Sequence, residues 1–242
     1  MYRRLLLLIC LALGCPAAAG PPFVTDDPQP TDTGHFEIYL FDQGGVGRDG
    51  VTTTGGVDFN YGALTDLQLT AVLPLEVQAP AAGPAVAGLG NIELAAKYKI
   101  FHQEDIGWDV AVFPRVFLPS ASSLVGDKHA SLLLPIWVQK DIGPWSTFGG
   151  GGCVINRGGD SQDYCLMGLA LTRHVLPDLL LGLEVVHQGA DTKGGRVFTG
   201  AGAGLIYDLS ERIHLLAYGG PGLQNAGASA QTSWYTSVLF TF

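Results

Sequence analysis

Four cysteines are the residues whose chemistry can be read most directly from their spacing. Cys10 and Cys15 lie close to the N-terminus, whereas Cys153 and Cys165 lie symmetrically about Gly159 in one expected hairpin. In an oxidising compartment the second pair is a candidate cross-strand disulfide beneath the hairpin loop. The alternative is that both are small apolar residues on the wall of the fold.

The remaining candidates for metal binding are weak. An acidic stretch contains Asp26, Asp27 and Asp32 but lacks the ligand spacing and the central glycine of a calcium loop. We interpret it as a solvated tail, or as a tail tucked against the floor of the fold. The histidines lack the paired spacing of a metal site and are scattered along the chain, at His35, His102, His129, His174, His187 and His214.

Gly200, Gly202 and Gly204 do not predict a phosphate loop, because a strand pattern follows them where a nucleotide fingerprint needs a helix. They predict inward space, for a passage or for a plug. An outer-membrane lipase is a second functional class, but neither His187 nor His214 has a neighbouring serine that strand parity places on the same outer face. We therefore expect no catalytic residue, no metal and no cofactor.

The N-terminus predicts export. Arg3 and Arg4 precede an apolar run and three alanines, which is typical of a signal peptide over 1–19 with cleavage after Ala19. The apolar run is too short to span a membrane as a helix. The alternative is a lipobox that ends at Cys15, although its small-residue position holds a leucine.

Composition then restricts the class of fold. Cleavage removes two of 13 basic residues and none of 22 acidic ones, so the mature chain carries 11 − 22 = −11, which argues against a nucleic-acid partner. The sequence is 47% hydrophobic, yet beyond the signal no stretch approaches the roughly 20 apolar residues of a spanning helix. An exported hydrophobic chain of this kind indicates a closed barrel.

Short segments of alternating apolar and polar residues fill the chain from about residue 35 onward. In one segment Leu94 and Tyr98 share a face, and Glu93, Lys97 and Lys99 share the other. This period of two predicts β-strands. We expect twelve, at 35–43, 51–61, 66–77, 91–101, 107–118, 130–139, 145–155, 163–172, 179–188, 197–207, 212–219 and 232–242.

Connections and aromatic residues set the orientation. Short turns alternate with mostly longer loops, as short periplasmic turns and longer outer loops do in bacterial barrels. Aromatic residues lie beside the predicted periplasmic ends. The final strand ends at the aromatic Phe242, a terminus of the kind that outer-membrane assembly machinery typically recognises, so we expect that machinery to be a partner. Pro114 and Pro135 fall inside predicted strands, where we expect bulges to absorb the lost donors.

One face of the strands is polar and predicts a hydrated lumen. If residues whose numbers sum to 208 face each other, then Lys99 meets Asp109, Glu93 meets Arg115, and Ile100 meets Trp108 on the apolar face. Coincidence is the alternative to this register. The expected lumen residues are Glu37, Asp58, Gln68, Glu93, Lys97, Lys99, Asp109, Arg115 and Glu184.

Several longer motifs resemble a known family. They are "GPPFVTDDPQP", "NYGALTDLQLTAVLPL", "GLGNIELAAKYKIF", "FPRVFLPS", "LPIWVQKDIGPWSTFGGGGCVIN", "LGLEVVHQG" and "GLIYDLS". Together they look like the meta-pathway phenol-degradation (MetA-pathway) family of outer-membrane transporter barrels, and the resemblance covers nearly all of the mature chain. It implies an outer-membrane location and a link to aromatic or other hydrophobic compounds, and it carries no binding residues across.

The sequence thus predicts an all-β protein: a signal peptide at 1–19, an N-terminal periplasmic extension at 20–34 and a closed antiparallel transmembrane barrel at 35–242. We expect a channel or transporter for small solutes in contact with the lipid bilayer. A soluble periplasmic or secreted β-barrel binder is the main alternative, and an outer-membrane lipid-modifying enzyme is the other.

Overall fold

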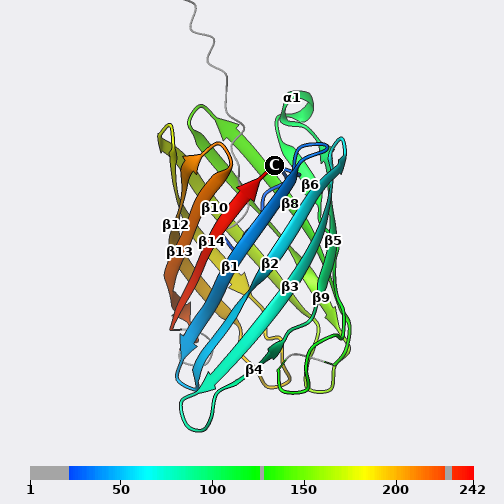
Figure 1. The fold of residues 1–242 in the computed structure, drawn as a ribbon, viewed down its shortest axis with the longest axis vertical. Coiled ribbons are helices and arrows are strands. Elements are labelled where there is room, and N and C mark those ends of the chain that lie inside the picture. The colour runs from blue at the N-terminus through cyan, green and yellow to red at the C-terminus, as the bar shows by residue number, and fades with distance from the viewer. Residues whose placement is uncertain (1–21, 126–127, 227–230) are drawn as a thin grey trace, which may run out of the picture.

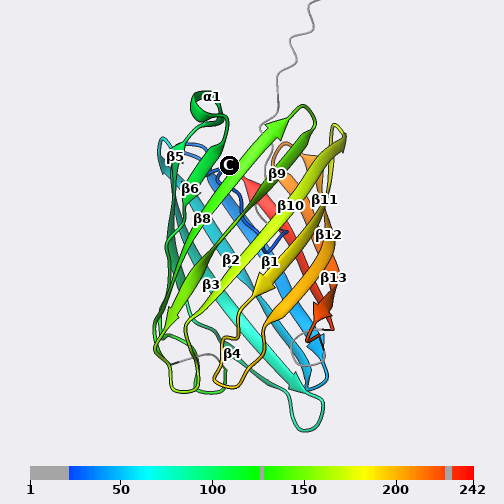
Figure 2. The same cartoon turned by 180° about the vertical axis from the view of Figure 1, so that it is seen from behind.

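The alternating segments form one closed antiparallel β-barrel in a computed structural model (Figures 1 and 2). The structure describes residues 22–125, 128–226 and 231–242, so the predicted signal peptide at 1–19 and the lipobox at Cys15 lie outside it. Strands β1 and β14 pair along their length and close the barrel. Closure leaves no free sheet edge, as a strand structure in lipid requires.

The elements follow in chain order as β1 (Phe36–Gly47), β2 (Gly50–Leu64), β3 (Leu67–Pro80), β4 (Val86–Leu89), β5 (Glu93–Phe101), α1 (Gln103–Ile106), β6 (Asp109–Val112), β7 (Arg115–Phe117), β8 (Ser131–Ile142), β9 (Trp145–Asn156), β10 (Tyr164–Leu176), β11 (Leu179–Gln188), β12 (Phe198–Ser210), β13 (Ile213–Gln224) and β14 (Thr232–Thr241). Both β4 and β5 pair with β3, and both β6 and β7 pair with β8. Each of these two pairs is one interrupted barrel strand, so the 14 segments make 14 − 2 = 12 barrel strands. The predicted twelve-stranded antiparallel barrel is confirmed. In the described ranges no helix is both long enough and apolar enough to cross a membrane.

The register predicted for the hairpin around Glu104, in which facing residue numbers sum to 208, is wrong: the observed sum is larger by two. Lys99 pairs with Ala111 and Glu93 pairs with Phe117, so facing numbers sum to 210. The short helix α1 occupies the turn, and a bulge at β5 lies between Lys99 and Phe101. The predicted register assumed a simple turn between two regular strands, with neither a helix nor a bulge. Because of these two features, Ile100 and Trp108 do not pair in the ladder.

The two prolines that fall inside predicted strands lie next to each other in the sheet, at the break between β6 and β7. Pro114 lies in the break between β6 and β7, and Pro135 lies in β8 beside that break. The Phe113 N–H donates to the Pro135 carbonyl at 3.2 Å, and the Ala96 N–H donates to the Pro114 carbonyl at 3.2 Å. Since a strand residue's N–H and C=O point to the same side, the donor that Pro135 lacks would have pointed at the break.

The outer surface of the barrel is apolar. On β11, Leu181, Leu183 and Val185 are 43%, 63% and 52% exposed, whereas Leu180 and Glu184, on the opposite face of the strand, are buried. The same alternation recurs around the barrel, with Leu69, Leu73, Leu94, Leu134, Met167 and Leu169 exposed. A continuous apolar surface of this size is a lipid-facing surface.

The two ends of the barrel differ. One end carries α1, the C-terminus and the short turns at 65–66, 143–144, 177–178 and 211–212 (Figure 1). The other end carries longer connections such as 157–163 and 189–197, but β1 and β2 are joined by only two residues, 48–49. By the rule of short periplasmic turns, the first is the periplasmic end and the second is the outer end.

Candidate functional site: a lumen shared with the N-terminal segment

The lumen holds a cavity of about 920 Å³. Its lining includes outer-end residues such as Arg48 and Pro84, and it extends inward to Phe23, Asp26 and Gln29. Six of the predicted lumen residues line it: Glu37, Asp58, Gln68, Glu93, Lys97 and Arg115. The other three, Lys99, Asp109 and Glu184, contact the chain that lies inside the barrel.

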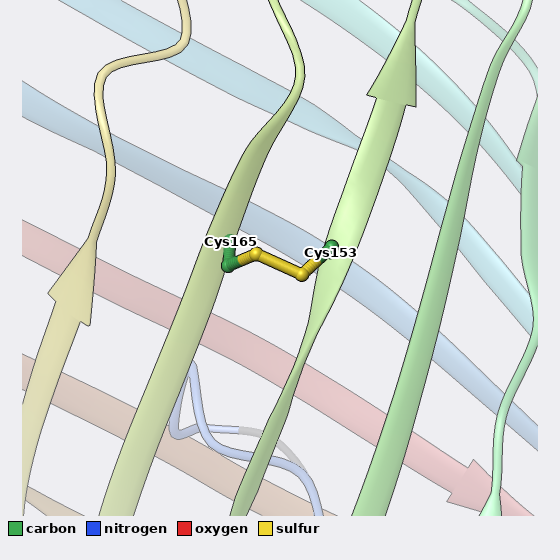
Figure 3. The surroundings of a disulfide bond; sticks show 2 residues. All are labelled: Cys153 and Cys165. Atoms are coloured by element: carbon green, nitrogen blue, oxygen red, sulfur yellow. A yellow bond between two sulfur atoms is a disulfide. The ribbon is translucent and has the colours of Figure 1, made fainter.

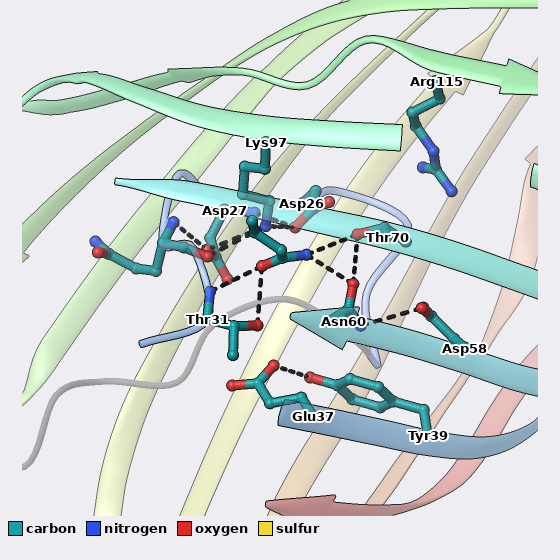
Figure 4. A network of polar contacts seen from close by, with 12 residues as sticks. Asp26, Asp27, Thr31, Glu37, Tyr39, Asp58, Asn60, Thr70, Lys97 and Arg115 are labelled. Carbon is teal, nitrogen blue, oxygen red and sulfur yellow. Dashed lines mark hydrogen bonds and ion pairs between the residues drawn. The ribbon is translucent and has the colours of Figure 1, made fainter. Parts of the chain in front are cut away.

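That internal chain is the N-terminal segment, residues 22–34, which lies within the barrel (Figure 4). Phe23 packs edge-on against Phe148 and Tyr218, with ring centroids 5.9 Å apart in both cases. Phe23, Phe148, Tyr218 and Ala170 form one buried cluster. The solvated-tail interpretation of the acidic stretch is wrong here, because Asp27 is fully buried.

Glycines on three neighbouring strands make room for this segment. A Cβ added at Gly182 or Gly204 would lie 2.5 or 2.9 Å from the Phe23 ring, and one added at Gly168 would collide with the Thr25 hydroxyl. We call these three residues the glycine socket. Gly202 makes similar room for Tyr218, and Gly200 makes room for Phe198, so all three glycines of the sequence triplet lie against aromatic rings.

Lysines of β5 bind the segment by charge. The Lys97 ammonium lies 2.9 Å from the Asp26 carboxylate and 3.7 Å from that of Asp27 (Figure 4). Lys99 lies 3.5 Å from Asp109 and also contacts the Gln29 side chain, whose amide donates to Asp109 at 2.9 Å. Burial raises the pKa of Asp27 from its ordinary 3.8 to about 7, an effect that the nearby Lys97 ammonium opposes.

A chain of hydrogen bonds through Gln68 and Asn60 holds the end of the segment. Gln68 accepts from the Thr31 N–H at 2.8 Å and donates to Asn60 at 2.7 Å. Asn60 in turn donates to Asp58 at 3.0 Å (Figure 4). On the other side of the lumen, the Glu184 carboxylate accepts from the Thr25 N–H at 2.5 Å. The segment is therefore bound to opposite walls.

Arg115 and Glu93 form a separate pair in the cavity. The Arg115 Nε and Nη2 donate to the two Glu93 oxygens at 2.7 and 2.8 Å. The guanidinium also lies over the rings of Phe113 and Phe117, 5.3 and 5.9 Å from their centroids. Such bidentate, stacked geometry fixes the orientation of the arginine.

The cysteines lie on the other side of the wall. Cys153 and Cys165 are direct partners across β9 and β10 and are joined by a disulfide (Figure 3). Both side chains face outward with Leu134, Met167 and Leu169, near the outer loop at 157–163. The bond therefore braces the outer half of the wall and does not line the cavity.

The histidines that sequence parity singled out have local partners. His187 lies 2.8 Å from the Thr199 hydroxyl, and His214 lies 2.6 Å from the Asp208 carboxylate. Among the described residues, no group of three or more His, Cys, Asp or Glu side chains is arranged to hold a metal ion.

Sequence reasoning missed that the acidic stretch and the lysines of β5 bind each other. Both were visible as charged groups, but 71 residues separate Asp26 from Lys97 and no local pattern joins them. The inward glycines on one strand were the available signal. Of these, Gly204 shares with Gly168 and Gly182 on the adjacent strands the volume that the N-terminal segment fills.

The fold is similar to those of three solved outer-membrane proteins. An outer membrane channel from Pseudomonas putida F1 is 13% identical, with a TM-score of 0.69, covering 89% of this chain and 98% of that one. A KdgM porin, solved in complex with disordered oligogalacturonate, has 12% identity, TM-score 0.57 and coverages of 86% and 99%. The NanC porin has 9% identity, TM-score 0.58 and coverages of 85% and 98%. The chain thus has the fold of an outer-membrane β-barrel, and no family model and no curated protein matches its sequence.

Proposed function

We propose that the protein is an outer-membrane channel for small solutes, with its own N-terminal segment acting as a plug. The observation that carries this is the 920 Å³ cavity, lined by charged and aromatic side chains inside a closed barrel with an apolar exterior. A twelve-stranded barrel encloses a narrower lumen than the 16-stranded to 18-stranded porins. This favours selective passage of small molecules over general diffusion.

The similarity to channels and porins supports the same assignment, and the finer resemblance to the meta-pathway family suggests aromatic or hydrophobic solutes. We further propose that residues 1–19 are removed on export and that the strand ending at Phe242 engages the assembly machinery. In this proposal the protein does no covalent chemistry. Its residues select and position solutes.

Planar-bilayer recording of the purified full-length barrel tests the proposal, with a variant lacking residues 22–30 as the open reference. We expect small or intermittent currents for the full chain and larger steady currents for the deletion. The channel proposal would be refuted if neither protein gave a current and if a strain without the gene showed no uptake defect.

Two cheaper measurements separate the alternatives. A barrel stays with outer membranes after a carbonate wash and migrates differently on gels before and after heating, whereas a soluble binder washes off. A lipid-modifying enzyme would release fatty acid or lysolipid from phospholipid vesicles, and the channel proposal predicts no release.

A further inference from the structure

The charges inside the lumen are unequally compensated. Three cations inside the lumen are already matched: Lys97 by Asp26 and Asp27, Lys99 by Asp109, and Arg115 by Glu93. A fourth, Arg48, lines the cavity at its outer end together with Asp49. Two further carboxylates line the cavity, Glu37 and Asp58. In the described part of the chain neither is within ion-pair distance of a cation. One wall of the cavity therefore carries two carboxyl groups that no cation among the described residues pairs with.

The partners of these two carboxylates are neutral. The Tyr39 hydroxyl donates to Glu37 at 3.1 Å, and the Asn60 amide donates to Asp58 at 3.0 Å (Figure 4). Tyr39 is also the direct partner of Asp58 across β1 and β2. The two acids thus flank one tyrosine, and Glu37 also has a side-chain hydrogen bond with Thr31. A carboxylate held this way gains more from an incoming cation than one that is already ion-paired.

Aromatic rings extend the same wall toward the outer end. Phe41 and Tyr235 line the cavity with nearly parallel rings, 6.2 Å between centroids and 3° between planes. Tyr39, Phe41 and Tyr235 all come from β1 and its neighbour β14. Ring faces attract organic cations, and the attraction adds to that of a nearby carboxylate.

We propose that this wall, formed by Glu37, Tyr39, Phe41, Asp58 and Tyr235, binds small organic cations such as alkylammonium groups, with Asp58 as the main determinant of charge selectivity. The inference rests on the proposed channel and names the class of solute that it prefers. Acidic side chains select cations in other pores for the same electrostatic reason. Anionic solutes would meet the same two carboxylates unfavourably.

The first test does not depend on conduction. Tetramethylammonium is titrated into the detergent-solubilised full-length protein and binding is followed by calorimetry, with propionate as the anionic counterpart. We expect saturable binding of the cation and none of the anion. Asp58→Asn should weaken binding of the cation about tenfold, because the variant loses one of the two carboxyl groups that attract it electrostatically.

Asp42→Asn is the matched control. Asp42 and Glu37 both lie on β1. Asp42, however, lines a groove on the outside of the barrel with Leu40, Leu215 and Val238 and does not line the lumen. Removing its charge changes the net charge equally and should leave tetramethylammonium binding unchanged. Equal losses in both variants, or no binding to the unaltered protein, would overturn the proposal.

The second test uses the reversal potential of the variant lacking residues 22–30 under a potassium chloride gradient. We expect cation selectivity that falls in Asp58→Asn and persists in Asp42→Asn. Binding without any current would contradict the channel but support the cation site. A reversal potential that shows chloride selectivity, or one that Asp58→Asn does not change, would contradict the cation site and support the channel.

Discussion

The carboxylate of Asp26 lies 2.9 Å from the ammonium of Lys97, although one residue precedes the first strand and the other lies in the middle of the barrel wall. Both side chains are largely buried, at 15% and 5% exposure. An ion pair in such a place is costly to break from one side only, because the remaining charge stays buried.

We predict that Lys97→Met releases the N-terminal segment. The change leaves Asp26 and Asp27 without their cation, which costs about 3–5 kcal/mol for a buried pair. The released segment should become cleavable in limited proteolysis followed by mass spectrometry, and the current should rise toward that of the deletion. Lys140→Met, which removes a lysine lying over Trp108, is the control and should change neither result.

Filling the glycine socket should have the same effect by steric exclusion. In Gly182→Val the new side chain occupies the place of the Phe23 ring, so the segment cannot dock. We expect faster proteolysis of the segment with normal heat-modifiable migration, which shows that the barrel itself still closes. Gly159→Val adds the same atoms where a Cβ meets nothing within 4 Å, and it should behave like the unaltered protein.

Acid should tighten the plug through Asp27. Because burial raises the pKa of Asp27 from 3.8 to about 7, the docked segment holds a proton that the released segment loses. Docking is therefore strongest below pH 4, weakens as the pH rises from about 4 to about 7, and then levels off. Lys97, Asp26 and Glu37 also act on this carboxyl group, so the measurement must isolate it.

The variant Asp27→Asn isolates the effect of this carboxyl group, because asparagine has nearly the same shape as aspartate but does not titrate. Proteolysis of the segment, measured from pH 5 to pH 8 with a pH-tolerant protease, should accelerate with pH in the unaltered protein. The slope should largely disappear in the variant. An equal slope in both proteins would assign the dependence to other groups.

The disulfide should stabilise the barrel without affecting permeation. Its two cysteines have a sequence separation of 12, for which loop-closure entropy gives about 3 kcal/mol. We expect Cys153→Ser with Cys165→Ser to lower the midpoint of urea unfolding in liposomes. Conductance and cation selectivity should stay the same, because both cysteines face away from the lumen. A changed selectivity would contradict the outward placement.

The sequence predicted the barrel well because alternation is a local property. The alternation of Leu181, Glu184 and Val185 with their immediate neighbours shows which side of the strand each side chain occupies. Twelve segments with this pattern predict a closed sheet. The register of a single hairpin is less local. Lys99 and Asp109 do meet at 3.5 Å, but across a ladder in which Lys99 faces Ala111. Long side chains reach a diagonal neighbour, so a correct contact was compatible with a wrong register.

The contents of the lumen depend on contacts that no local pattern encodes. The Thr25 N–H and Glu184 are 159 residues apart, and Thr31 and Gln68 are 37 apart. Hydrophobic alternation says which residues point inward but not what they meet. The inward glycines predicted empty volume, and only the three-dimensional arrangement showed that Phe23 fills it.

The pairing of β1 with β14 has a consequence for biogenesis. This seam joins the first strand of the chain to the last, so the cylinder cannot be sealed until the final strand has been synthesised and delivered. Residues 22–34 immediately precede the seam and end up inside it. They must either be gathered in before the cylinder is sealed or thread in afterwards through its periplasmic mouth, and the order of these two events decides whether a newborn barrel is ever leaky.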